Sequence, residues 1–136
     1  MLALMEERER QRVRVLVVDD NCDLADSTAE VLRLVDYDVR TAYTGEEAVD
    51  VAGQYRPDIV ILDINMPGMD GFQTARQLKR DRRLATKPFL AYTGVDEPLV
   101  RQVASQIGFH GLVVKGEPMS ALIDVMLEIH EERHYS

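Results

Sequence analysis

Several residue types are scarce or absent in this chain of 136 residues, and each absence excludes a class of protein. The single cysteine, Cys22, cannot form an internal disulfide, which suits a reducing compartment, and we therefore expect a cytoplasmic protein. No His or Cys is adjacent to it, so we interpret Cys22 as a bystander and not as a reactive thiol. No apolar run approaches the roughly 18 residues that a membrane span needs. The short apolar start, Met1–Met5, is followed by acidic residues and does not resemble a secretion signal.

Basic residues are also fewer than acidic ones. The chain has 16 Lys and Arg against 24 Asp and Glu, which gives a formal net charge of −8. Nucleic-acid backbones require a basic face, so we expect no direct nucleic-acid partner. Tryptophan is absent and aromatic residues make up 6%, whereas hydrophobic residues make up 46%. This composition fits a single domain with an aliphatic α/β core.

Two short apolar runs end in acidic residues. Ile59–Leu62 is unbroken and β-branched, is bounded by proline and glycine, and ends at Asp63. Val13–Val18 is a second run, in which Val15, Leu16, Val17 and Val18 are contiguous, and it ends at Asp19-Asp20. Runs of this kind predict strands that are buried on both faces. Ligands of open parallel sheets bind at the carboxyl ends of the strands, so we expect the three carboxylates to converge there.

Strand-like and helix-like segments alternate along the rest of the chain. This order predicts a parallel sheet with helices on both faces and right-handed crossovers. We expect strands at 13–18, 37–42, 59–62, 87–92 and 111–114, and helices at 24–34, 45–55, 70 to 80 or 82, 98–107 and from 118 onward.

Helix ends carry recognisable signals. Asp23 or Asp26 is available to cap the first helix, and Thr44 with Glu47 has the spacing of a capping box. Pro98–Ile107 is followed by Gly108, a favoured C-terminal cap. We expect the inward positions of the last two helices to be Leu99, Val100, Val103, Ala104 and Ile107, and then Met119, Leu122, Ile123, Met126 and Ile129.

Polar residues follow four of the five predicted strands. They are Asp19-Asp20, Asp63, Thr93 and Lys115. Crowded carboxylates repel one another unless a cation lies between them, and hard oxygen ligands suit Mg²⁺. A further carboxylate, a hydroxyl and an ammonium beside such an ion suit phosphoryl transfer onto the carboxylate.

These segments resemble the receiver domains of two-component response regulators. The resemblance rests on Val17-Val18-Asp19-Asp20-Asn21, Leu62-Asp63-Ile64-Asn65-Met66-Pro67-Gly68-Met69-Asp70-Gly71, Ala91-Tyr92-Thr93-Gly94 and Val113-Val114-Lys115. It covers residues 12–132, with a charged extension at 1–11 and a tail at 133–136. It implies a doubly wound, flavodoxin-like (βα)5 fold with five parallel strands in the order 2-1-3-4-5.

The resemblance also implies a metal site with Mg²⁺ as the cofactor. Asp20 is implied as a direct ligand, and Asp19 as the residue that positions the ion or its waters. Asp63 lies at the same site, and Asn65 is implied to offer its backbone carbonyl.

A phosphorylation cycle is implied as well. Asp63 accepts the phosphoryl group, Thr93 contacts it and moves with it, and Lys115 pairs with a phosphoryl oxygen. The implied donor is a phosphohistidine on a sensor histidine kinase or a histidine phosphotransfer protein. The chain would assist its own phosphorylation and dephosphorylation, carry no separate output enzyme, and signal to a downstream protein.

Two positions depart from the family pattern. Proline usually follows the conserved lysine directly, whereas Lys115-Gly116-Glu117-Pro118 is two residues longer. We expect a trans Lys115–Gly116 bond, because a cis bond not preceding proline costs about 3 kcal/mol, and a positive φ at Gly116. Leu112 stands where the family often has an aromatic or His, so Thr93 is expected to carry the signal.

Two other functions stay open. One is an interaction module that keeps the fold but works without phosphorylation. The other is a metallohydrolase, because His130-Glu131-Glu132-Arg133-His134 matches a zinc-protease signature. We favour a solvated last turn for this motif, since a helix end at the C-terminus cannot shield a metal site.

Overall fold

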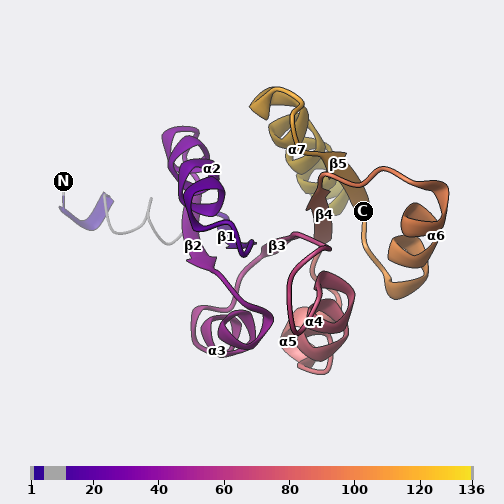
Figure 1. The fold of residues 1–136 in the computed structure, drawn as a ribbon. Helices are drawn as coiled ribbons and strands as arrows, with labels where there is room; N and C mark the ends of the chain where they lie inside the picture. Colours follow the sequence, from indigo (N-terminus) through magenta and orange to yellow (C-terminus); the bar gives the residue numbers. More distant parts are fainter. Residues whose placement is uncertain (1, 5–11, 136) are drawn as a thin grey trace.

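The computed structural model describes residues 2–4 and 12–135, with side chains as far as His130. Most of the predicted extension at 1–11 and the side chains of the predicted tail at 133–136 lie outside this description. The described strands form one parallel sheet in the order β2-β1-β3-β4-β5 (Figure 1), as expected from the resemblance. They are β1 (Arg14–Val18), β2 (Asp38–Ala42), β3 (Ile59–Leu62), β4 (Phe89–Thr93) and β5 (Gly111–Val114).

Helices cover both faces of this sheet, which confirms the doubly wound fold. They are α2 (Cys22–Leu34), α3 (Gly45–Tyr55), α4 (Gly71–Leu78), α5 (Arg82–Ala85), α6 (Pro98–Ile107) and α7 (Met119–Tyr135). In Figure 1, α2 and α7 lie on one side of the strands and α3 and α4 on the other. Alternate residues of the buried strands divide between two core clusters: Leu16 packs with the layer of α3, α4 and α6, and Val15 with α2 and α7.

Local sequence explains most helix ends. The Thr44 side chain accepts a hydrogen bond from the Glu47 amide (3.0 Å), but the Glu47 carboxylate accepts from the Tyr43 amide, so the predicted capping box is only half formed. A complete box instead joins Asp70 to Gln73 at the start of α4. Gly108 ends α6 with a φ of 104°, in the left-handed region that glycine tolerates best.

Three predictions about helices were wrong. Neither Asp23 nor Asp26 caps α2, because the Asn21 side chain accepts from the Leu24 amide and the helix begins two residues earlier than expected. The helix predicted to reach Arg80 or Arg82 ends at Leu78, since the side chain of Asp81 caps the separate short helix α5. Leu99 is 68% exposed, so it does not lie on the inward face of α6.

The last helix agrees better with its predicted face. Leu122, Met126 and Ile129 are buried, and Met119 and Ile123 pack against the same cluster. The helix begins at Met119, one residue later than expected, and Pro118 directly precedes it.

Gly71 fixes the start of α4 against the end of β3. A Cβ atom at this position would lie 2.2 Å from the Asp63 carbonyl oxygen and 2.7 Å from Ile64 Cα, both of which are backbone atoms. The Gly71 amide donates to the Ile64 carbonyl at 2.9 Å. Glycine is therefore required where the helix approaches the loop that carries Asp63.

We predict that Gly71→Ala lowers the free energy of unfolding by roughly 1–3 kcal/mol, because backbone must move to admit the methyl group. Gly53→Ala is the matched control: it lies in α3 with no atom within 4 Å of the added Cβ. That variant should gain roughly 0.5–1 kcal/mol from higher helix propensity. Urea denaturation measures both, and similar stabilities for the two variants would contradict the close packing at Gly71.

Candidate functional site

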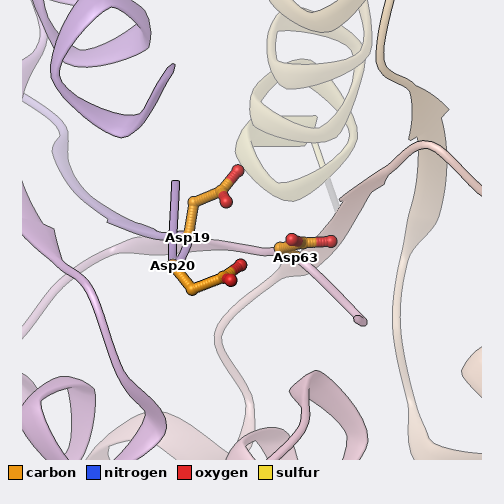
Figure 2. Close-up of side chains that lie close together, drawn as sticks. All are labelled: Asp19, Asp20 and Asp63. Carbon is orange, nitrogen blue, oxygen red and sulfur yellow. The ribbon is translucent and has the colours of Figure 1, made fainter. Parts of the chain in front are cut away.

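Three carboxylates gather at the carboxyl ends of β1 and β3 (Figure 2). Val18 and Leu62 are partners in the parallel register, so Asp19 and Asp63, the residues that follow them, leave the sheet side by side. One oxygen of each of Asp19, Asp20 and Asp63 lies within 4.8 Å of the others. Among the residues whose side chains are described, no other group of three potential metal ligands is found.

Lys115 joins two of these acids. Its Nζ lies 2.7 Å from Asp19 Oδ2 and 3.1 Å from Asp63 Oδ2. The backbone places it there, because the Lys115 amide donates to the Thr93 carbonyl at 2.8 Å and so continues the pairing of β4 with β5. The ammonium group thus connects the end of β5 to the ends of β1 and β3.

Backbone amides hold the other oxygens of the two buried acids. Asp19 Oδ1 accepts from the Asn21 amide (3.0 Å), and Asp63 Oδ1 accepts from the Asn65 amide (3.3 Å). Each acid therefore receives one amide and shares one ammonium group. Asp20 is exposed, and its carboxylate makes no ion pair with any cation in the described part of the chain.

These two hydrogen bonds reveal a signal in the sequence that the strand-end pattern alone does not capture. Asp-Xaa-Asn occurs at the end of both strands, as Asp19-Asp20-Asn21 and as Asp63-Ile64-Asn65. In each case the aspartate bonds to the amide two residues ahead, which is the local turn that aspartate favours. The side chain of Asn21 also caps the start of α2. The repeated triplet could have predicted both turns.

Burial and nearby charges both shift the pKa values of Asp63 and Lys115. Burial raises the pKa of Asp63 above its ordinary value; the Lys115 ammonium opposes this rise, and the charge of Asp19 adds to it. Burial alone would lower the pKa of Lys115, but its contacts with Asp19 and then Asp63 prevail and raise it. Three carboxylates face one ammonium group, so the cluster keeps an excess of negative charge that a cation would neutralise.

Thr93 and Leu112 lie on the neighbouring strands. Thr93 is fully buried at the end of β4, and its hydroxyl oxygen accepts from the Val95 amide at 3.3 Å. Leu112 is half-buried in β5 and packs against the core cluster on the side of α6. The structure thus brings Asp19, Asp20, Asp63 and Lys115 together and links Thr93 to Lys115 through the backbone.

The longer loop after Lys115 follows the expected path. The described residues contain no cis peptide bond, which confirms the trans Lys115–Gly116 bond, and Gly116 has a φ of 96°. The backbones of Lys115 and Glu117 form an isolated β-bridge. The loop therefore accommodates its two extra residues without withdrawing the Lys115 side chain from the acids.

The zinc-protease signature lies away from this cluster. The last helix, α7, starts just after the Lys115 loop and runs to Tyr135. His130 lines a surface hollow with Arg12 and Tyr37, which precede β1 and β2 at the amino ends of the strands. The side chains of the motif after His130 lie outside the described residues. None of the described helices is both long and apolar enough to cross a membrane.

Comparison with known proteins agrees with this geometry. The family model of the response regulator receiver domain matches residues 15–127. The structure is similar to that of the chemotaxis protein CheY4 of Vibrio cholerae, with a TM-score of 0.83 and 29% identity over 86% of this chain and 98% of that one. A CheY-like receiver domain protein from Methanospirillum hungatei shares the fold, with a TM-score of 0.84 and 22% identity over 92% of this chain and 98% of that one.

We predict that Lys115→Met lowers the free energy of unfolding by about 3 kcal/mol when no divalent cation is present. The change removes the only ammonium group that the described residues place between Asp19 and Asp63, and leaves two buried carboxylates facing each other. Urea denaturation in the presence of a chelator gives the value.

A second substitution separates charge from packing. If repulsion causes the loss, Lys115→Met combined with Asp63→Asn should recover a large part of it, because one carboxylate is then neutral. Equal losses in the single and double variants would mean that repulsion between the two carboxylates is not the cause.

Proposed function

The chain belongs to the response regulator receiver domain family, and we propose that it is a phosphorylatable signalling switch in which Asp63 accepts a phosphoryl group from a phosphohistidine. One observation carries the proposal: a buried carboxylate at the carboxyl end of the middle strand lies beside two other acids and in contact with a lysine. Few structural roles require that combination, because buried like charges destabilise a fold.

Asp63 is the best acceptor of the three acids. Asp19 lies closer to Lys115 than Asp63 does (2.7 against 3.1 Å), so its carboxylate is the more firmly engaged of the two. Asp20 is exposed to solvent. Asp63 combines burial with the more distant lysine contact, and burial raises its pKa, which makes its oxygen more basic than that of an ordinary aspartate.

The donor set fits Mg²⁺. Three carboxylates crowd within 4.8 Å, and among the described residues one ammonium group offsets them, so a hard divalent cation would relieve the remaining repulsion. We assign Asp20 and Asp63 as direct ligands with the Asn65 carbonyl, and Asp19 as the group that orients the ion or its waters. When bound, Mg²⁺ supplies positive charge beside the phosphoryl oxygens.

The transfer itself needs only an exchange of bonds at phosphorus. An Asp63 oxygen attacks the phosphorus atom, and the bond to the imidazole nitrogen breaks with its electron pair returning to the ring. The Lys115 ammonium neutralises one phosphoryl oxygen, and the Thr93 hydroxyl donates a hydrogen bond to another. Before transfer Lys115 pairs with both acids, so its contact with Asp63 is the one that exchanges for the phosphoryl group.

We place the protein in the cytoplasm, with a sensor histidine kinase or histidine phosphotransfer protein as donor and a downstream protein as receiver of the signal. The single cysteine, which cannot form an internal disulfide, agrees with this placement. The active site assists phosphorylation and dephosphorylation of Asp63 itself, and no other enzymatic activity is assigned.

We predict that acetyl phosphate phosphorylates the wild-type protein in the presence of Mg²⁺ and that Asp63→Asn abolishes the reaction, because the acceptor oxygen is lost. Intact-protein mass spectrometry detects the added phosphoryl group. Asp20→Ala should require more Mg²⁺ for the same reaction, since it removes a proposed metal ligand; the loss of a ligand-supporting group already costs about 10–100-fold in affinity.

Asp23→Asn is the matched control. Asp23 is an exposed acid in the first turn of α2, close to Asp20 in the sequence, but it does not belong to the cluster of three carboxylates. It should gain mass like the wild type. An equal mass gain in Asp63→Asn and in the wild type would show that another residue is the acceptor.

We further predict that Thr93, and not Leu112, couples phosphorylation to the rest of the domain. Leu112 has no polar group that could distinguish the two states, whereas the buried Thr93 hydroxyl gains a charged partner only when Asp63 is modified. Amide chemical shifts on α6 and β5, measured with and without the phosphoryl mimic beryllofluoride, should change in Leu112→Ala and not in Thr93→Ala.

The same spectra test the alternative that this is an interaction module independent of phosphorylation. Such a module would show no Mg²⁺-dependent beryllofluoride shifts in the wild type. A response that survives in Thr93→Ala and disappears in Leu112→Ala would reverse the assigned roles.

A further inference from the structure

Charge is unevenly distributed along this acidic chain. Residues 71–87, which form α4, α5 and the approach to β4, contain six cations and one acid, a net charge of +5. The remaining residues contain ten cations and 23 acids, a net charge of −13. A basic surface on an acidic protein attracts partners that the rest of the molecule repels.

A hollow of about 390 Å³ lies on this basic segment, between α4 and α6. We call it the α4–α6 basic hollow; it is lined by Arg76, Lys79, Arg80, Val103, Gln106 and Ile107. Three cations from the α4 side thus face two half-buried aliphatic side chains of α6. Arg76 lies in α4 and Arg80 lies two residues beyond its end, and both also line a neighbouring hollow with Met69 and Gln73.

Two of these cations are available to a ligand. The Lys79 ammonium donates to the Ala85 carbonyl (3.3 Å) and lies 4.5 Å from the centre of the Phe89 ring, so it is already engaged. Arg76 and Arg80 are exposed and form no ion pair with any acid in the described part of the chain. Each of these guanidinium groups can bind a carboxylate in a bidentate manner.

We propose that the α4–α6 basic hollow binds a short acidic segment of a partner protein. Carboxylates of the segment pair with Arg76 and Arg80, and one apolar side chain enters the hollow against Val103 and Ile107. The proposal does not depend on the phosphorylation of Asp63. It adds to the switch a second surface with its own recognition chemistry.

The charge distribution favours a short peptide over longer polyanions. A nucleic acid or an anionic membrane would extend beyond the basic segment and meet the acidic residues that predominate in the rest of the chain. A peptide of a few residues can stay within the basic segment. The aliphatic pair at Val103 and Ile107 also suits a leucine-like side chain, whereas a phosphate backbone offers nothing to fill it.

The test uses the full chain and an array of synthetic acidic peptides that carry one or two leucines at varied spacing. The peptide that binds most strongly is labelled with fluorescein, and its affinity is measured by fluorescence anisotropy. Arg76→Glu combined with Arg80→Glu should weaken binding about tenfold, since two exposed ion pairs, each of modest strength, are lost together. Added salt should weaken binding to the wild type, and replacing the peptide's leucines by serine should do so as well.

Arg40→Glu combined with Arg101→Glu is the matched control. It changes the net charge equally, but Arg40 lies on the edge strand β2 and Arg101 lines a different hollow, beside β5. This variant should keep the wild-type affinity, and thermal unfolding verifies that both double variants are folded.

Three results would overturn the proposal. They are the absence of any binding peptide, equal weakening in the two double variants, and stronger binding of a single-stranded RNA oligonucleotide or of phosphatidylserine vesicles at the same arginines. The last result would assign the α4–α6 basic hollow to a different class of partner.

Discussion

The contact of Lys115 with two buried carboxylates is the interaction on which the site depends. Asp19, Asp63 and Lys115 come from the ends of three strands, so their ion pairs tie β1, β3 and β5 together at one edge of the sheet. Without the ammonium group, Asp19 and Asp63 would repel each other in a buried position. The fold therefore tolerates these two buried acids because Lys115, which is more than 50 positions away in the sequence, lies beside them and offsets their charge.

The parallel topology brings Lys115 close to the two acids. Every strand of the sheet points the same way, so the residues that follow the strands all emerge at the same edge. Backbone pairing then sets their positions: the register of Val18 with Leu62 aligns the two acids, and the Lys115 amide bonded to Thr93 extends β5 by one residue. Gly71 lets α4 begin against the same loop without displacing it.

The sequence predicts the strands and the family fold well, because a short aliphatic run that ends in a polar residue suits a buried parallel strand better than a helix or a loop. Ile59–Leu62, Pro98–Ile107 and Gly111–Val114 were predicted with the bounds that the structure has. Helix starts were harder to predict, since Asn21, Asp23 and Asp26 can all cap and only tertiary position selects among them. No glycine or proline lies at the break between α4 and α5, so the sequence around it reads as one continuous helix. The break arises because the Asp81 side chain caps a new helix there.

For the site, the sequence identified the residues but not their pairing. Strand ends predicted that Asp19, Asp20, Asp63 and Lys115 converge, yet no pattern shows that Lys115 contacts both buried acids and leaves Asp20 exposed. That difference matters chemically. A buried acid with an engaged lysine is held in place, whereas an exposed acid beside it can bind a cation without first breaking an ion pair. The division of three similar carboxylates into two fixed groups and one exposed group thus follows from distance and burial, which a sequence does not specify.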